Sequence, residues 1–277
     1  MKTFYPTLCV SFALSIILSA CNSKNPCGGI DVDVKIPPVI PPETTNKFIT
    51  LEIENASGIG GEIRQLDIFS YSDHLLQHRN IPHYQDTIHI PVVSQSGVVV
   101  ILANAFGSFN HQGLYHHDAW NEVSINLKND NPLLPIMRDM IHWHDPVQAL
   151  TSKLKPLLCE IRLRSITHYL GDTFLLESPR VWLESASTYV ALFREGNYPP
   201  INQEDTSPVF MPNDIGIYTQ YPNISLWCYP NETPITPTSP PTKLIMEYEL
   251  NGKTCKFSQE IHPILANGIS YIDINIK

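Results

Sequence analysis

The residues best suited to chemistry are histidines in two short segments. His117 stands beside Asp118 in one segment, and residues 142–145 of the other read His-Trp-His-Asp. Imidazole and carboxylate groups are common zinc ligands, so a fold that joined His117 to His142 or His144 could build a metal site. The string lacks the additional histidine that metallo-hydrolase motifs hold at a fixed spacing. We therefore expect solvated loops and no bound metal.

Other signatures of catalysis are absent from the sequence. It contains no Gly-x-Ser-x-Gly elbow, no phosphate-binding glycine loop and no His-Glu-x-x-His. The tryptophans could line a sugar-binding platform, although most tryptophans in a small β-sandwich belong to its core or rim. The four tryptophans are Trp120, Trp143, Trp182 and Trp227. We predict a protein without enzymatic activity or cofactor.

The cysteines leave two interpretations open. After the N-terminal segment, the remaining cysteines are Cys27, Cys159, Cys228 and Cys255. An even number permits two disulfides in an oxidising compartment, with three connectivities. Cys228 and Cys255 are both expected to point inward from strands, which makes a bridge between them one candidate. Inert thiols packed as small hydrophobic side chains are the alternative.

Composition limits the classes of fold and partner. The chain has 24 prolines in 277 residues, well above the usual share of about 5%. Proline inside a helix removes a hydrogen-bond donor and clashes with the preceding turn, so a helical bundle is excluded. The net charge of −9 argues against a nucleic-acid partner, which requires a clustered basic surface.

From residue 47 the hydrophobic residues follow the period of two that is typical of strands. Ile49, Leu51 and Ile53 alternate with polar residues, and 98–102 is a continuous apolar run that indicates a strand buried on both faces. In the first half, strands are expected near 48–54, 62–71, 88–90, 98–102 and 123–127. In the second half they are expected near 157–164, 181–183, 189–193, 215–220, 224–229 and 269–277, besides one hairpin. The boundaries predict β-sandwiches at 47–135 and 157–277, with a bridge at 136–156 that includes a short helix near 146–154.

The hairpin is predicted at Asn251-Gly252, the dipeptide favoured in type I′ turns. Counting outward from the turn places Tyr248 opposite Cys255 and Glu247 opposite Lys256. One face of the hairpin would then be apolar, and the other would carry the pair of opposite charges.

The N-terminus reads as a targeting segment. Its apolar run of 13 residues is too short to span a bilayer but suits a signal peptide. The run ends in Leu18-Ser19-Ala20-Cys21, which resembles the lipobox of bacterial lipoproteins. We expect cleavage of residues 1–20, acylation of Cys21 with chains such as palmitate, and a Pro-rich tether over 21–46.

These features together resemble the FimB-type minor fimbrial subunits of Bacteroidia, the lipid-anchored accessory proteins of type V fimbriae. The stretches that carry the resemblance are the lipobox at 18–21, the strand-rich run at 48–104, the segment 157–164 and the approach to the final strand at 265–271. The histidine-rich bridge and the long Pro-rich loop at 230–241 depart from the pattern.

The resemblance implies an all-β fold of two transthyretin-like (Greek-key) β-sandwich domains in tandem, after a lipoprotein signal peptide and a Pro-rich tether. It also implies a non-catalytic anchor or accessory subunit of a fimbrium at the cell outer membrane. Such a protein would bind a pilin by β-strand addition and hold outer-membrane lipid through Cys21. A surface lipoprotein that binds a glycan is the alternative, and a metal-dependent hydrolase is a third hypothesis.

Overall fold

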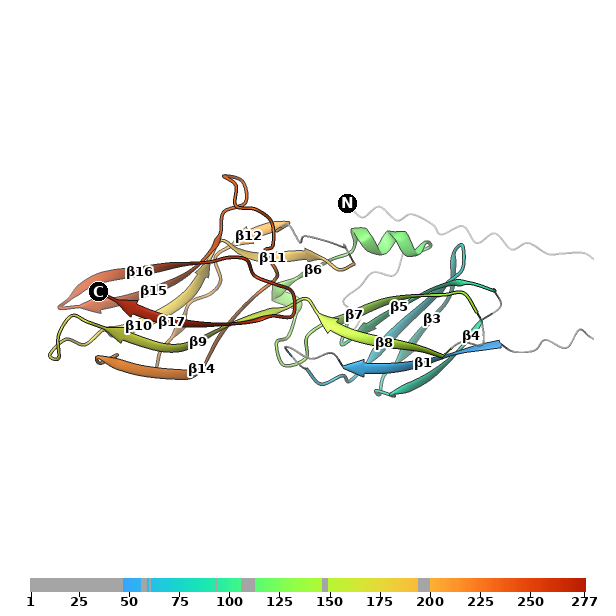
Figure 1. Ribbon diagram of the computed structural model, residues 1–277, viewed down its shortest axis with the longest axis horizontal. Helices are drawn as coiled ribbons and strands as arrows, with labels where there is room; N and C mark the ends of the chain where they lie inside the picture. The colour runs from blue at the N-terminus through green and yellow to red at the C-terminus, as the bar shows by residue number, and fades with distance from the viewer. Residues whose placement is uncertain are drawn as a thin grey trace, which may run out of the picture. The chain divides into compact units, whose positions relative to one another are not determined.

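The computed structural model describes residues 47–55, 59, 61–92, 94–105, 113–145, 149–193 and 200–277; of residues 47, 55 and 219–223 it describes the backbone alone. Thr45–Lys277 forms one compact unit. Strands dominate it, as Figure 1 shows, and the predicted all-β class is confirmed. The described helices are two short 3-10 turns, and none is long and apolar enough to cross a membrane.

The first half is built on a seven-stranded sheet that encloses its own core. Its order is β3-β2-β5-β7-β8-β1-β4. The strands are β1 (Lys47–Asn55), β2 (Leu66–Tyr71), β3 (Leu75–Ile81), β4 (Thr87–Val92), β5 (Gly97–Ala103), β7 (Met137–Trp143) and β8 (Ala149–Pro156). Ile49, Leu51 and Ile53 of β1 are buried as the alternation predicts, and they pack with residues of β2 and β5 in one cluster.

The prediction that residues 136–156 form a bridge between two domains, with a short helix, is wrong. The segment forms β7 and β8, which complete the first sheet, and the residues described within 146–154 are strand instead of helix. In β8 the buried positions alternate strictly, but one of them is Ser152, and this polar residue hides the strand period. Its hydroxyl donates a hydrogen bond of 2.9 Å to Asp139 of β7, which makes burial of the serine tolerable.

The second half contains a two-layered sandwich. One layer has the order β13-β10-β15-β16 and the other β14-β9-β17. The strands are β9 (Cys159–His168), β10 (Glu177–Glu184), β13 (Val209–Phe210), β14 (Tyr218–Cys228), β15 (Thr242–Leu250), β16 (Lys253–Ile261) and β17 (Ile269–Ile276). Their inward residues, among them Leu163, Val181 and Ile274, form a single cluster.

A fourth sheet joins the two halves. β6 (Ser124–Asn126), predicted within the first sandwich, pairs with β11 (Ala186–Ala191), which pairs with β12 (Asn202–Glu204). Beneath this sheet lies a further hydrophobic core, which we call the shared core and which includes the residues on the outer face of β2 and β5. It is formed chiefly by Phe69, Tyr71, Val98, Val100, Leu102, Trp120, Ile125, Leu157, Leu158, Val190, Leu192, Phe193 and Tyr229. β5 is therefore buried on both faces, as its apolar run predicts.

The hairpin prediction is confirmed in turn and register. Asn251 and Gly252 have φ of 52° and 72°, and Tyr248 faces Cys255 while Glu247 faces Lys256. The two opposite charges pair with β10 and not with each other. Glu247 bonds Arg180, and Lys256 lies 3.8 Å from Glu184. β15 lies between β10 and β16, so Glu247 has a directly opposite residue on each side, and it pairs with Arg180 of β10.

We expect Gly97→Ala to destabilise the protein by about 1–3 kcal/mol or more. A Cβ at Gly97 would lie 2.0 Å from the carbonyl oxygen of Tyr71 and 2.3 Å from the Trp143 ring, both inside the close-packed first half. Gly216→Ala is the matched control, since a Cβ there meets nothing within 4 Å. Urea unfolding of the two variants measures the difference, and equal midpoints would contradict this packing at Gly97.

Candidate functional site

Several predicted site residues fall outside the described part of the chain. Cys21, the expected acylation site, and Cys27 both lie in residues 1–46. Lipidation, the signal peptide and the tether therefore stay predictions.

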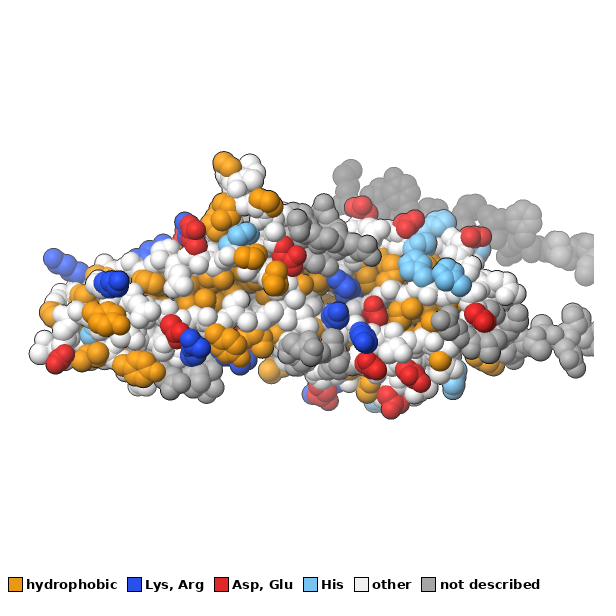
Figure 2. Space-filling model, in the orientation of Figure 1, with side chains coloured by type: hydrophobic (Ala, Val, Ile, Leu, Met, Phe, Trp, Pro, Cys, Tyr) orange, Lys and Arg blue, Asp and Glu red, His pale blue; other side chains and the backbone are white. Residues whose placement is uncertain are grey.

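The structure brings two of the three histidines together without building a metal site. The rings of His117 and His142 are 6.1 Å apart and perpendicular, and Nε2 of His117 lies 3.4 Å from Asp118. Figure 2 shows histidines gathered over the first half of the molecule. His144 is exposed beyond the end of β7. Among the described residues, no group of three or more His, Cys, Asp or Glu is placed to hold a metal ion.

The candidate bridge between Cys228 and Cys255 is not formed. Both are free thiols, as is Cys159. Cys228 lies opposite Cys159 on β9, whereas Cys255 lies opposite Tyr248 in the other layer. Burial raises the pKa of the Cys228 thiol to about 12 and also raises the pKa of Cys159, so both thiols stay protonated at neutral pH. These two cysteines fit the alternative interpretation of inert core residues.

The tryptophans do not form a common platform. Trp120 and Trp143 are fully buried. The indole of Trp120 donates a hydrogen bond of 2.9 Å to the hydroxyl of Tyr71. Trp182 and Trp227 are partly exposed, but they belong to β10 and β14, in different layers.

The surface best suited to a binding role is the outer edge of β17. Within the described residues β17 ends its layer, where it pairs in parallel with β9 alone. The carbonyl of Gly268, just before β17, accepts a hydrogen bond from Glu160 N–H of β9, and the carbonyl of Ile276 accepts one from Tyr169 N–H, just after β9. Because backbone groups alternate in direction along a strand, the odd-numbered residues Tyr271 and Asp273 direct their N–H and C=O groups away from β9.

Other sheet edges carry features that discourage pairing with a further strand. β16 carries Lys253, Lys256 and Glu260, β4 contains Pro91, and β14 contains Pro222 within an irregular register. β12 and β13 have only three and two residues. β17 has eight residues, no proline and a single charged side chain, Asp273. β3, at one end of the seven-stranded sheet, also lacks proline and carries the charged Arg79, but it is one residue shorter than β17.

Polar contacts on its outer face hold β17 to β9. Arg164 donates to both carboxylate oxygens of Asp273, from Nε to Oδ1 at 3.0 Å and from Nη2 to Oδ2. The hydroxyl of Ser165 donates to Oδ1 of Asp273 at 2.5 Å. These donors lower the pKa of Asp273 to about 2. The guanidinium of Arg162 lies 5.6 Å from the ring of Tyr271 and bonds Glu160 with two hydrogen bonds, at 2.8 and 2.7 Å.

A cavity of about 390 Å³ lies at the beginning of β17. Its lining includes Leu133, Glu160, Arg162, Trp227 and Ile269. Leu133 is 81% exposed although it is apolar. The cavity beside the first residues of β17 is therefore lined by both the buried carboxylate of Glu160 and apolar side chains.

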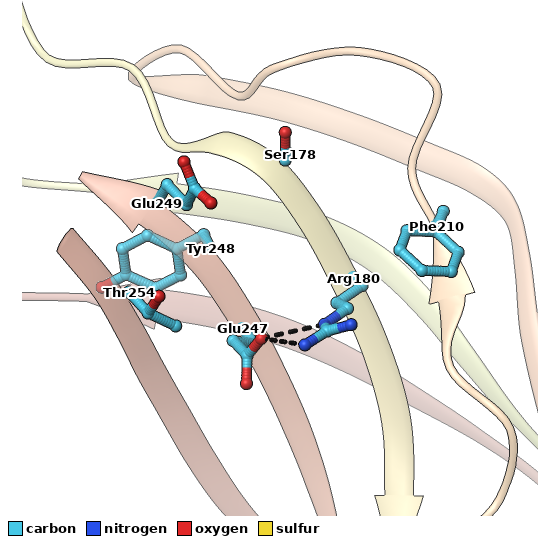
Figure 3. A pocket seen from close by; sticks show the side chains of 7 residues that line it. All are labelled: Ser178, Arg180, Phe210, Glu247, Tyr248, Glu249 and Thr254. Atoms are coloured by element: carbon cyan, nitrogen blue, oxygen red, sulfur yellow. Dashed lines mark hydrogen bonds and ion pairs between the residues drawn. The ribbon is translucent and has the colours of Figure 1, made fainter. Parts of the chain in front are cut away.

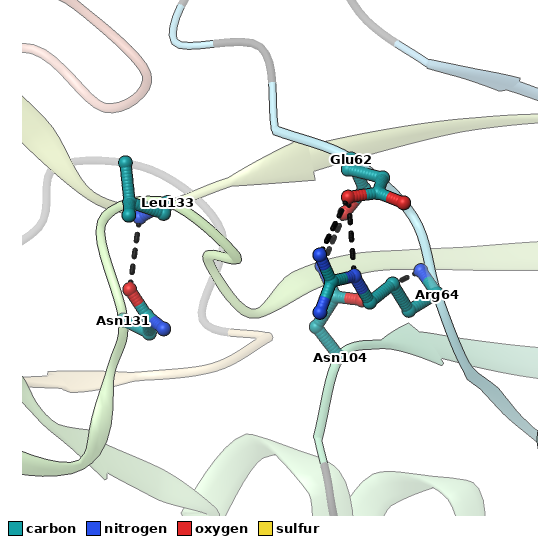
Figure 4. A network of polar contacts seen from close by, with 5 residues as sticks. All are labelled: Glu62, Arg64, Asn104, Asn131 and Leu133. Carbon is teal, nitrogen blue, oxygen red and sulfur yellow. Dashed lines mark hydrogen bonds and ion pairs between the residues drawn. The ribbon is translucent and has the colours of Figure 1, made fainter.

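A polar network fixes one wall of this cavity (Figure 4). Asn104, at a positive φ of 58°, donates to the carbonyls of Glu62 and Pro135 at 2.9 and 3.1 Å and accepts from Arg64 N–H at 3.0 Å. On the same side of the molecule, Ile59 N–H donates 2.9 Å to Asn267, just before β17. The start of β17 is thereby tied to the first half.

The sequence predicted the strand at 269–277 but not the polar contacts that hold it to β9. Arg162 and Arg164 alternate along one expected strand and Asp273 lies on another, and this complementarity was the available signal. Nothing in the sequence aligns the two strands, because the residues are 109 positions apart.

No family model matches the sequence, and no curated protein matches it. Solved structures do match. A candidate cell adhesion protein from Parabacteroides distasonis has 12% identity and a TM-score of 0.64, over 83% of this chain and 88% of its own. A fimbrilin from Porphyromonas gingivalis has 11% identity and a TM-score of 0.57, over 78% and 81%. A fimbrial assembly protein from P. distasonis has 11% identity and a TM-score of 0.52, over 82% and 90%. The chain shares the β-rich fold of these proteins.

We expect Asp273→Asn to remove an acid-sensitive part of the stability. The pKa of Asp273 is lowered from 3.8 to about 2, so its contribution is complete above about pH 4 and is lost as the pH falls toward 2. The variant should therefore show a smaller loss of stability between pH 4 and pH 2 in thermal unfolding. Asp172→Asn, at an exposed loop position, is the control and should keep the wild-type profile. Identical profiles for wild type and Asp273→Asn would contradict a stabilising contact between Asp273 and β9.

Proposed function

We propose that the protein is a non-catalytic, lipid-anchored subunit of a surface fimbrium, which binds a neighbouring subunit by strand addition along β17. The observation that carries the proposal is the unprotected edge of β17. The likeness of the fold to a fimbrilin and a fimbrial assembly protein supports the same function.

Strand addition uses groups that β17 already presents. An incoming strand would bond the outward N–H and C=O groups of Tyr271 and Asp273. Each backbone hydrogen bond contributes about 0.5–1.5 kcal/mol net, and side-chain pockets add specificity. The ring of Tyr271, 52% exposed, and the nearby cavity provide such contacts.

The anchoring part of the proposal rests on the N-terminal sequence. Acyl chains on Cys21 would hold the protein at the outer membrane, and the prolines of 21–46 would act as a spacer between the lipid and the folded unit. An accessory role of the FimB type, attaching the fimbrium to the membrane, is the specific form that we propose.

We expect Tyr271→Pro to weaken assembly by at least about tenfold, because proline removes an outward N–H and adds bulk at the pairing edge. The β9–β17 ladder should survive, since this N–H does not point at β9. The measurement is the amount of the subunit that co-sediments with fimbriae sheared from cells.

Tyr271→Ala is the matched control, because it removes the same ring but keeps the N–H. It should assemble better than Tyr271→Pro. Equal co-sedimentation of Tyr271→Pro and wild type, with both folded by thermal unfolding, would rule out pairing at this edge.

We also expect Cys21→Ser to release the protein from the membrane fraction, since the acylated thiol would be lost. Cys27→Ser, six residues along the tether, should remain membrane-bound. Fractionation with mass spectrometry of the N-terminal peptide checks both. An unacylated Cys21 in the wild-type protein would overturn the anchor.

A further inference from the structure

The outer face of the layer β13-β10-β15-β16 contains a hollow of about 240 Å³ (Figure 3). All four strands contribute to it, with Phe210 from β13, Arg180 from β10, Glu247 and Glu249 from β15, and Thr254 from β16. It lies in a different layer from β17, so its use does not depend on the proposed strand addition.

The hollow coincides with an irregularity in β10. The register of β10 against β15 shifts between Glu177 and Arg180. Ser178, in the shifted stretch, has a φ of 49°, and its N–H donates 3.0 Å to Asp214. Bulges re-aim side chains, and strained non-glycine residues concentrate where a function requires them. The shift takes Ser178 out of regular pairing and leaves it in the wall of the hollow.

The lining combines an aromatic face with hydrogen-bonding groups. Phe210 is 68% exposed, and the guanidinium of Arg180 lies 5.8 Å from its ring. Arg180 gives both of its hydrogen bonds to a single oxygen of Glu247, Oε1. The second oxygen, Oε2, is directed away from Arg180 in Figure 3. Glu249 and the hydroxyls of Ser178 and Thr254 add further acceptors and donors.

We propose that this hollow binds one pyranose unit of a neutral glycan. A sugar ring has an apolar C–H face, which matches Phe210, and peripheral hydroxyls, which match carboxylate and hydroxyl partners. Arg180 is neutralised by Glu247, so Glu249 leaves a net negative lining that disfavours acidic sugars and phosphates. The hollow is small and open, which suits a single unit of a surface chain and not an enclosed metabolite.

The test is affinity electrophoresis of the mature chain in gels that contain the neutral polysaccharides laminarin, dextran or galactomannan, with polygalacturonate as the acidic comparison. At least one neutral polysaccharide should retard the protein. Phe210→Ala should weaken that retardation at least tenfold, and Glu249→Gln should weaken it less. Both positions are exposed, so the variants should keep the wild-type unfolding midpoint.

Tyr169→Ala is the matched control, since this ring is 66% exposed but does not line the hollow. It should bind as wild type does. Retardation by no neutral polysaccharide, retardation by polygalacturonate alone, or undiminished retardation of folded Phe210→Ala would each overturn the proposal. None of these results would bear on assembly through β17, which is measured by co-sedimentation.

Discussion

The shared core is the constraint on which the rest of the described structure depends. Strands of the first half bury one face in the folded seven-stranded sheet and the other against residues of the second half. Aromatic side chains fill the centre, and their polar atoms are paired within it. Tyr71 accepts from Trp120 and donates 3.1 Å to the carbonyl of Leu114. Buried polar groups that find partners in this way specify one packing arrangement.

A buried carboxylate adds to this specificity. Asp130 accepts from Ile136 N–H at 2.9 Å and from the hydroxyl of Tyr229 at 3.1 Å. Burial raises the pKa of Asp130, and burial with the nearby carboxylate raises the pKa of Tyr229. The contact joins the segment after β6 to the residue after β14. Relative motion of the two halves would therefore break paired buried groups, at a cost of about 1–3 kcal/mol for each group left unpaired.

The parts of the fold that follow from local pattern were predictable from the sequence. The hairpin register follows from Asn251-Gly252, and the double burial of β5 follows from its apolar run. β3 was missed because all of its residues except Ile81 are half-buried or exposed, and β8 was missed because Ser152 interrupts its apolar alternation. The place of β6 beside β11, and the contact of Asp273 with Arg164, depend on long-range pairing that no local pattern encodes.

The pairing of β9 has a consequence for how the chain folds. Its two neighbours in the layer are β14 and β17, and the contact of Arg164 with Asp273 closes a separation of 109 residues. Contacts this distant in sequence form slowly, since a long loop must close before they stabilise anything. During that interval β9, whose apolar residues alternate with Glu160, Arg162 and Arg164, has two open edges that another polypeptide could occupy.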